Sequence, residues 1–179
     1  MKIEMRKLKV IAPFLIGLLF IGGCGTSTTT EEKKEEPTTK KELSLIEKFD
    51  FEDLDGNKIN WADTKGQIVF VNFWATWCKP CIKEMPSISE ANIQLKDKNV
   101  MFIIASDEGI EKIKKFESKH DYSFNLVHSK ASIFDLGVQA LPTTIIINEN
   151  GDIVFNEIGS RDWGSEKSIA LITSFSSKE

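Results

Sequence analysis

The sequence predicts an α/β domain with a mixed central sheet and helices on both faces. Two apolar runs, residues 68–74 and 100–105, have the length and continuity of strands that are buried on both sides. Two more strand-like segments, residues 143–147 and 153–157, are joined by a short polar turn. Strands that alternate with helical segments and end in an antiparallel pair are typical of a mixed sheet.

The other elements follow from local patterns. An N-terminal β-hairpin is expected at residues 49–61, because Asp55-Gly56 separates two short apolar segments. Apolar spacing from Lys79 to about Lys98 predicts a helix, which Pro86 is expected to kink. Further helices are expected at residues 110–119, at residues 132–136 and, capped by Ser165, at residues 165–175.

Length and composition indicate one folded domain. The chain has 179 residues, of which 41% are hydrophobic and 28% are charged, and this is enough for one core. The net charge of −4 argues against nucleic acid as a partner. We therefore expect a single domain at residues 43–179, preceded by two segments of different character.

Residues 1–23 resemble the signal peptide of a bacterial lipoprotein. Basic side chains precede an apolar stretch at residues 10–21 that is too short to span a bilayer. The sequence Ile21-Gly22-Gly23-Cys24 resembles a lipobox, which implies cleavage before Cys24 and lipid attachment to this cysteine. The alternative is an ordinary secretory signal with an incidental cysteine. Residues 24–42, rich in Thr, Glu and Lys, predict a solvated tether.

The most informative motif is Trp77-Cys78-Lys79-Pro80-Cys81, which comes shortly after the first buried strand. Two cysteines with this spacing can change between dithiol and disulfide without moving the backbone. A strand that leads into them places Cys78 at the start of a helix, where a thiolate is stabilised. We expect Cys78 to attack a substrate disulfide and Cys81, one turn further, to resolve the mixed disulfide.

The segment Phe73–Cys81, Pro86 and Leu141-Pro142-Thr143 together resemble the signature of thioredoxin-fold proteins. The resemblance covers about residues 45–176 and, with the signal and tether, is strongest to the membrane-anchored TlpA/ResA-type thiol-disulfide oxidoreductases. It implies a thioredoxin fold and no added cofactor. The substrate-binding surface that it implies consists of Trp77, Lys79, Pro80, Leu141 and Pro142. For Trp77, an ordinary core aromatic is the alternative.

Glu84 distinguishes subgroups of this fold. It lies three positions after Cys81, so a helix places both residues near the same face. A partly buried carboxyl there could exchange a proton with Cys81 and would have a raised pKa. ResA-like proteins keep a glutamate at this place in the motif, whereas thioredoxin usually buries an aspartate in the preceding strand, where this chain has Asn72. The alternative for Glu84 is a solvated helix residue.

Pro142 occupies, by resemblance, the place of the cis-proline of the thioredoxin fold. Because proline lacks a backbone N–H, it would leave an edge beside Cys78 where an extended substrate pairs, and it would discourage metal binding there. A trans proline that opens the strand at residues 143–147 is the alternative.

A zinc site made of Cys78, Cys81, His120 and His128 is formally open, because these residues supply four ligands. The spacing of the two histidines is not that of a usual metal-binding pair, and Pro80 suits a redox loop. We therefore expect no metal site.

The leading functional interpretation is an extracytoplasmic enzyme that reduces protein disulfides. The resemblance implies a membrane thiol transporter as electron donor and apocytochrome c, during haem attachment, as a candidate substrate. A monomer held to the membrane by lipid at Cys24 is the default. A disulfide oxidant or isomerase is less favoured, because DsbA-like oxidants carry a longer helical insertion. Peroxide reduction is disfavoured by the CxxC pair, and a non-catalytic binding module or chaperone is the alternative from another class.

Overall fold

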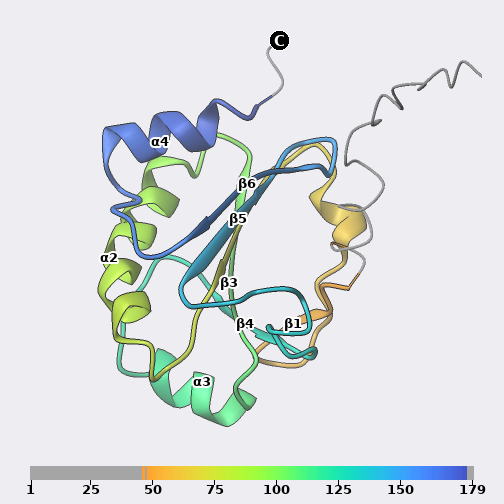
Figure 1. Cartoon of the computed structure of the whole chain (residues 1–179), viewed down its shortest axis with the longest axis vertical. Coiled ribbons are helices and arrows are strands. Elements are labelled where there is room, and N and C mark those ends of the chain that lie inside the picture. The colour runs from red at the N-terminus through yellow and green to blue at the C-terminus, as the bar shows by residue number, and fades with distance from the viewer. Residues whose placement is uncertain (1–45, 47, 177–179) are drawn as a thin grey trace, which may run out of the picture. The chain divides into compact units, whose positions relative to one another are not determined.

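The computed structural model describes residue 46 and residues 48–176 (Figure 1). These residues fall within the predicted domain. The predicted signal peptide at residues 1–23 and the tether at residues 24–42, with Cys24, lie outside the described residues. Within the part of the chain that is described, no helix is both long enough and apolar enough to cross a bilayer.

The described residues form a mixed six-stranded sheet, as the sequence predicts. In chain order the strands are β1 (Phe51–Asp53), β2 (Ile68–Phe73), β3 (Val100–Ser106), β4 (Leu126–Ser129), β5 (Thr143–Ile147) and β6 (Ile153–Ile158). Their spatial order is β1-β4-β3-β2-β5-β6. The central strand β2 pairs in parallel with β3 and antiparallel with β5, and every residue of β2 is buried. This burial explains its nearly continuous apolar sequence.

Three described α-helices contribute to the core on one face of the sheet. They are α2 (Lys79–Gln94), α3 (Ile110–Glu117) and α4 (Glu166–Thr173). Their buried residues Met85, Ile113 and Ile172 belong to one cluster with Phe70 of β2. Ser165 caps α4 as predicted, since its hydroxyl accepts a hydrogen bond from the N–H of Ser168.

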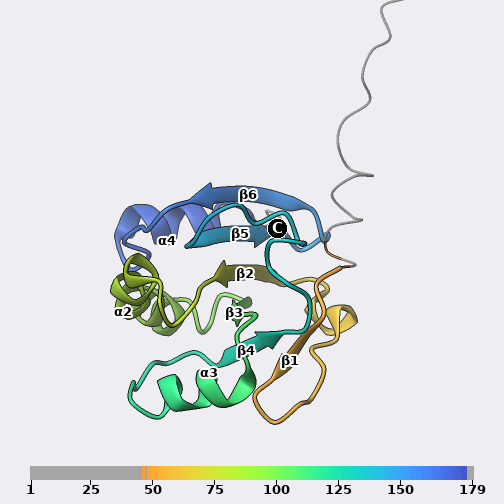
Figure 2. The same cartoon turned by 60° about the horizontal axis from the view of Figure 1, so that its bottom comes forward.

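The opposite face is covered by a short 3-10 helix, η1 (Trp61–Thr64), and by irregular segments (Figure 2). Phe49, Phe51, Trp61 and Phe73 pack here with contacting ring centroids between 5.4 and 6.1 Å apart. These rings exclude water from the side of the sheet that faces away from α2. Helical segments therefore lie on both faces of the sheet. Among the described residues, η1 is the helical segment on the face opposite α2, α3 and α4.

Two local expectations need correction. Residues 132–136 form turns instead of a helix, and the expected chain order omits β4, whose four residues are too few to show a clear pattern. The N-terminal turn does form, with a hydrogen bond from Asp53 N to Asn57 O at 2.9 Å and an isolated bridge between Glu52 and Lys58. The strand partner of β1 is nevertheless β4, which pairs with all three residues of β1, whereas Lys58 forms only the isolated bridge.

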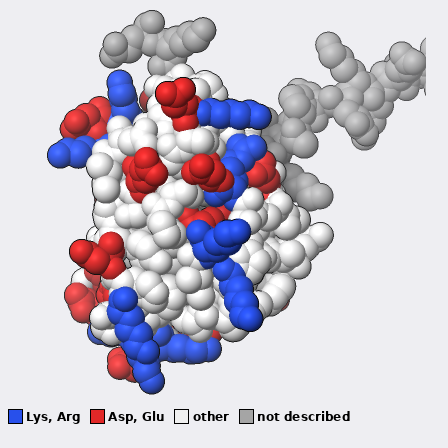
Figure 3. Space-filling view, turned by 90° about the vertical axis from the view of Figure 1, so that its left-hand side faces the viewer, with Lys and Arg blue, Asp and Glu red and all other residues white. Residues whose placement is uncertain are grey.

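The surface formed by α2 and α4 carries charges of both signs. Acidic and basic side chains are intermixed on this face, with uncharged areas between them (Figure 3). A mixed surface of this kind creates no strong field of one sign over the face.

Candidate active site

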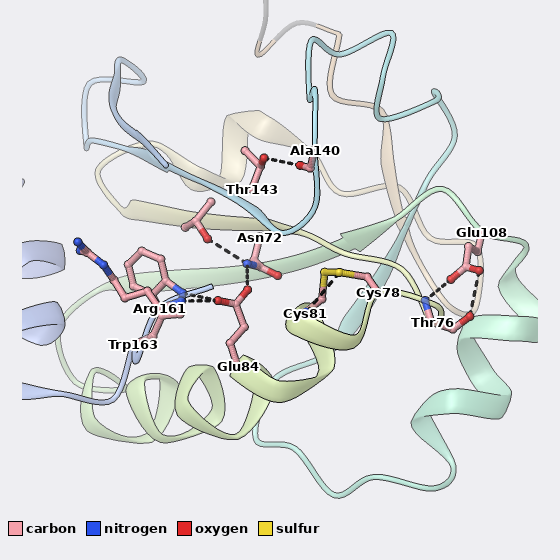
Figure 4. Close-up of a disulfide and its surroundings, with 11 residues drawn as sticks. Asn72, Thr76, Cys78, Cys81, Glu84, Glu108, Ala140, Thr143, Arg161 and Trp163 are labelled. Carbon is pink, nitrogen blue, oxygen red and sulfur yellow. Dashed lines mark hydrogen bonds between the residues drawn. A yellow bond between two sulfur atoms is a disulfide. The ribbon is translucent and has the colours of Figure 1, made fainter. Parts of the chain in front are cut away.

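Cys78 and Cys81 form a disulfide at the start of α2 (Figure 4). Their Cα atoms are 5.3 Å apart. Cys78 is the N-cap residue of the helix, and its sulfur accepts a hydrogen bond from the backbone N–H of Cys81 at 3.3 Å. The buried strand β2 delivers the chain to this point, so the predicted cysteine pair sits at a strand-to-helix junction.

The start of α2 favours a thiolate at Cys78 once the disulfide is reduced. The first N–H groups of a helix have no partners within it, and the helix dipole adds positive potential there. The first turn of α2 contains no acidic residue, and the exposed Lys79 adds a positive charge. Cys78 keeps 4% of its surface exposed and Cys81 none, so a substrate sulfur can approach Cys78 more easily than Cys81.

Trp77 lies at the surface directly before the disulfide. Its side chain is 63% exposed, so the alternative of a core aromatic is wrong. An exposed indole beside a reactive sulfur offers apolar contact area to a partner, and such area is unusual on a surface otherwise rich in polar groups.

Glu84 is buried, and its carboxylate accepts hydrogen bonds from three described residues. Oε1 accepts from Asn72 Nδ2 at 2.9 Å. Oε2 accepts from the backbone N–H of Arg161 at 3.0 Å and from Trp163 Nε1 at 3.3 Å. The alternative of a solvated helix residue is therefore wrong, and the carboxyl points into the protein one helical turn after Cys81 (Figure 4).

Burial raises the pKa of the Glu84 carboxyl above its ordinary value of 4.5. The hydrogen bonds from Arg161, Asn72 and Trp163 stabilise the charged form and oppose this effect, while the negative charge of Glu157 adds to it. The net direction is upward because desolvation of the carboxylate is the largest contribution. A carboxyl with a raised pKa can hold and release a proton closer to neutral pH.

Asn72 links Glu84 to the sheet. Its side-chain N–H groups donate to Glu84 and, at 2.9 Å, to Thr144 Oγ1 of the neighbouring strand β5. Asn72 itself is fully buried, and among the described residues its Oδ1 has no hydrogen-bond partner. Asn72, which cannot titrate, therefore supports the Glu84 carboxyl by a hydrogen bond.

A cavity of about 490 Å³ lies between α2 and the loop after β6, and Glu84 is one of the residues that line it. Lys83, Ser87, Arg161 and Asp162 are among the residues that line it. The cavity brings solvent close to a carboxyl that is itself only 4% exposed. Neither Cys78 nor Cys81 is among the residues that line this cavity.

Pro142 follows a cis peptide bond with Leu141, as the resemblance implied, and the trans alternative is wrong. The strand β5 begins at the next residue, Thr143, which lies opposite Phe73 at the end of β2. Pro142 therefore lies at the same end of the sheet as the disulfide. Leu141 is half-buried and packs against the core from this end.

Three residues of this region carry no local signal in the sequence. Arg161 and Trp163 reach Glu84 from the loop between β6 and α4, far along the chain. Glu108, between β3 and α3, accepts hydrogen bonds from Thr76 just before the cysteines. Contacts over such sequence separations depend on the fold, and no local motif marks them.

The two histidines take part in other contacts. His120 bonds through Nδ1 to Phe116 O at 2.8 Å and stacks on the Phe116 ring. His128 pairs through Nδ1 with Glu52 at 2.9 Å. In the described part of the chain, no group of three or more His, Cys, Asp or Glu side chains is arranged to hold a metal ion.

Comparison with known proteins agrees with this geometry. The AhpC/TSA family profile matches residues 44–156. The chain belongs to the AhpC/TSA family. Within it, the chain is 36% identical over 157 residues to thiol-disulfide oxidoreductase ResA of Bacillus thuringiensis subsp. konkukian (strain 97-27), covering 84% of this chain and 88% of that protein. It is 32% identical over 131 residues to thioredoxin-like protein YneN of Bacillus subtilis (strain 168), covering 68% and 77%.

Solved structures of this family's fold include a Bacteroides vulgatus protein provisionally named a thiol-disulfide oxidoreductase. It superposes with a TM-score of 0.63 at 26% identity, over 71% of this chain and 91% of that chain. The exposed lipoprotein thioredoxin Etrx1 of Streptococcus pneumoniae strain TIGR4 has a TM-score of 0.60 at 21% identity, over 70% and 97%. The thioredoxin fold is confirmed, and the protein is a ResA-like thiol-disulfide oxidoreductase.

Proposed function

We propose that this oxidoreductase works as a reductase of protein disulfides outside the cytoplasm. The observation that carries the proposal is the Cys78–Cys81 disulfide at the N-terminus of α2, with the buried carboxyl of Glu84 one turn further. Cys78 is the attacking sulfur, because it is the more exposed cysteine and faces the positive end of the helix.

The exchange runs in two steps. The Cys78 thiolate attacks one sulfur of the substrate disulfide, the substrate S–S bond breaks, and the leaving thiolate takes a proton. Cys81 then passes its proton to Glu84 and attacks the Cys78 sulfur. The mixed disulfide breaks, and the second substrate thiolate leaves and is protonated. The substrate gains two electrons and two protons, and the protein ends as the Cys78–Cys81 disulfide.

Glu84 serves as the proton acceptor for Cys81. Its raised pKa makes the carboxylate a stronger proton acceptor than an exposed glutamate, and the adjoining cavity lets it return the proton to water. The carboxylate is held in one orientation by Asn72, Arg161 and Trp163. Little rearrangement is therefore needed when Glu84 gains or loses a proton.

Trp77, Lys79, Pro80, Leu141 and Pro142 form the substrate-binding surface of this proposal. Trp77, Lys79 and Pro80 are exposed, and the end of the sheet that carries Pro142 is also the end that carries the disulfide. An extended substrate segment can pair along the backbone near Pro142 while its sulfur meets Cys78.

The cellular setting is part of the same proposal. The lipobox-like sequence ending at Cys24 and the polar tether after it support an exported domain anchored to a membrane by lipid. A reductase in an oxidising compartment needs electrons from the cytoplasm, which a membrane thiol transporter supplies. Apocytochrome c is the candidate substrate, because its paired cysteines must be reduced before haem attaches.

The reduction potential of the Cys78–Cys81 pair tests the direction of exchange. The purified chain is equilibrated against glutathione or dithiothreitol buffers, and tryptophan fluorescence reports the redox state. A midpoint near or below about −230 mV supports a reductase, whereas one near about −120 mV identifies an oxidant. A chain with both cysteines changed to serine is the control and has no transition.

The same double-serine variant separates catalysis from scaffolding. If the protein acts as a binding module or chaperone, the variant keeps its cellular function. If it acts as an oxidoreductase, the variant loses that function while its fold is retained, since serine is close in size to cysteine.

A further inference from the structure

Glu108 clamps the loop that leads into the disulfide. This residue lies between β3 and α3, and its side chain is 10% exposed. The backbone N–H of Thr76 donates to Glu108 Oε2 at 2.5 Å, and the Thr76 hydroxyl donates to Oε1 at 3.0 Å (Figure 4). One carboxylate thus binds both polar groups of a residue that is distant in the sequence.

Two further hydrogen bonds, one to the carboxylate and one from the backbone, hold Glu108 in place. Lys112 Nζ, one turn along α3, bonds to Oε1, and the backbone N–H of Glu108 donates to Ser106 Oγ at 3.3 Å. Burial raises the pKa of Glu108, but the hydrogen bonds from Lys112 and Thr76 outweigh it, and the net pKa lies below the ordinary value of 4.5. Glu108 is therefore an anion at neutral pH.

The clamped segment is short and carries exposed functional groups. Trp74 N bonds to Ala105 O at 3.0 Å before it, and Cys78 N bonds to Ala75 O at 3.0 Å after it. Between these two fixed points lie Thr76 and the exposed Trp77. Among the described residues, Glu108 accepts hydrogen bonds from both the backbone N–H and the hydroxyl of Thr76, so it fixes the Ala75–Thr76 peptide plane one residue before Trp77.

We propose that Glu108 is a positioning residue that holds the Thr76–Trp77 segment so that an extended protein substrate meets the Trp77 ring and the Cys78 sulfur together. Glu108 acts through Thr76 and touches no reacting atom. The inference rests on the proposed role of Cys78 as the attacking sulfur. A protein substrate contacts both Trp77 and Cys78 and needs their relative placement, whereas a small disulfide needs the sulfur alone.

The test compares two substrates on the full-length chain in detergent. Insulin serves as the protein disulfide, and bis(2-hydroxyethyl) disulfide serves as the small one. Glu108→Ala removes the clamp, and Glu108→Gln keeps one carbonyl acceptor for Thr76 without the charge. Glu111→Ala is the matched control, because it removes an exposed carboxylate from the first turn of α3, three residues after Glu108. Thr76→Val, which loses the hydroxyl but keeps the N–H, is a second and milder variant.

We expect Glu108→Ala to lower kcat/KM for insulin by about tenfold or more, since small misplacements of reacting groups are costly. Its rate with bis(2-hydroxyethyl) disulfide and its redox equilibrium with glutathione stay within about twofold of the wild type. Glu108→Gln and Thr76→Val give intermediate losses with insulin alone, and Glu111→Ala matches the wild type on both substrates.

Equal losses on both substrates overturn the proposal, because they indicate general damage to the site. The proposal is also overturned if Glu108→Gln lowers the rate with both substrates and shifts the pH profile of Cys78 alkylation. That result would show that the charge of Glu108 acts on the Cys78 thiolate. The proposal is overturned as well if both Glu108→Ala and Thr76→Val keep the wild-type kcat/KM for insulin. The proposed function is tested separately, by whether the wild-type protein reduces the two substrates at all. The role of Glu108 is tested by the ratio of the variant rates to the wild-type rates.

Discussion

Replacing Glu84 tests how the buried carboxyl is supported. Glu84→Leu keeps a side chain of similar size but removes the acceptor that Arg161 N and Trp163 Nε1 share. Glu84→Gln keeps one acceptor oxygen and exchanges the other for an NH₂ group. The two variants therefore separate the loss of charge from the loss of hydrogen-bond acceptors.

The structure sets the expected magnitudes. In Glu84→Leu the Asn72 amide still bonds to Thr144, but the N–H groups of Arg161 and Trp163 lose their acceptor. At about 1–3 kcal/mol for each buried donor left unpaired, the free energy of unfolding falls by about 2–4 kcal/mol after the carboxyl's own burial cost is removed. In Glu84→Gln, the amide oxygen serves both donors and Asn72 can rotate to present its unpartnered Oδ1, so the loss stays below about 1 kcal/mol.

The pH dependence has a definite sign. The folded-state pKa of Glu84 is raised, so its contribution to stability is fully present below the ordinary value of 4.5 and is lost as pH rises through the folded-state pKa. Glutamine does not titrate. The stability of Glu84→Gln relative to the wild type therefore increases from pH 4 to pH 8, by about 1.4 kcal/mol for each tenfold change in the acid dissociation constant on folding.

Urea unfolding of the oxidised chain, followed by tryptophan fluorescence at pH 4, 6 and 8, measures both effects. We predict that Glu84→Leu is the less stable variant at every pH and that the difference in unfolding free energy between the wild type and Glu84→Gln changes with pH. If Glu84→Leu is as stable as Glu84→Gln, the N–H groups of Arg161 and Trp163 donate hydrogen bonds to water in the Leu variant. A gap that does not vary with pH would show that burial does not raise the pKa.

Four further predictions follow from the site and the sequence. Glu84→Gln slows resolution of the mixed disulfide by about 10²-fold in single-turnover measurements, because general base catalysis is lost; an unchanged rate would assign the proton transfer to water. Cys81→Ser accumulates a mixed disulfide on Cys78 that mass spectrometry detects, and labelling elsewhere would contradict the assignment of the attacking sulfur. Trp77→Ala changes the free energy of unfolding by less than about 0.5 kcal/mol, since the ring is 63% exposed, but weakens insulin reduction. Cys24→Ala moves the protein from the membrane to the soluble fraction, and retention in the membrane would refute lipid attachment at Cys24.

The local sequence determined the redox centre and most of the fold. The apolar runs predicted β2 and β3, the CxxC spacing predicted the disulfide at a helix start, and Ser165 predicted the cap of α4. Each of these depends on residues that are neighbours along the chain, where hydrophobic period and capping chemistry act directly. At residues 132–136 the sequence predicted a helix where turns form, because a short apolar segment fits a helix and a covered turn equally well.

The tertiary structure alone decided what surrounds the cysteines. The sequence placed Glu84 near Cys81, but the desolvation that raises its pKa, and the opposing hydrogen bonds from Arg161 and Trp163, arise only when the loop between β6 and α4 packs against α2. Glu108 reaches Thr76 in the same way, across the end of the sheet. Desolvation and long-range hydrogen bonds arise when strands and helices pack, so no spacing of residues along the chain can specify them.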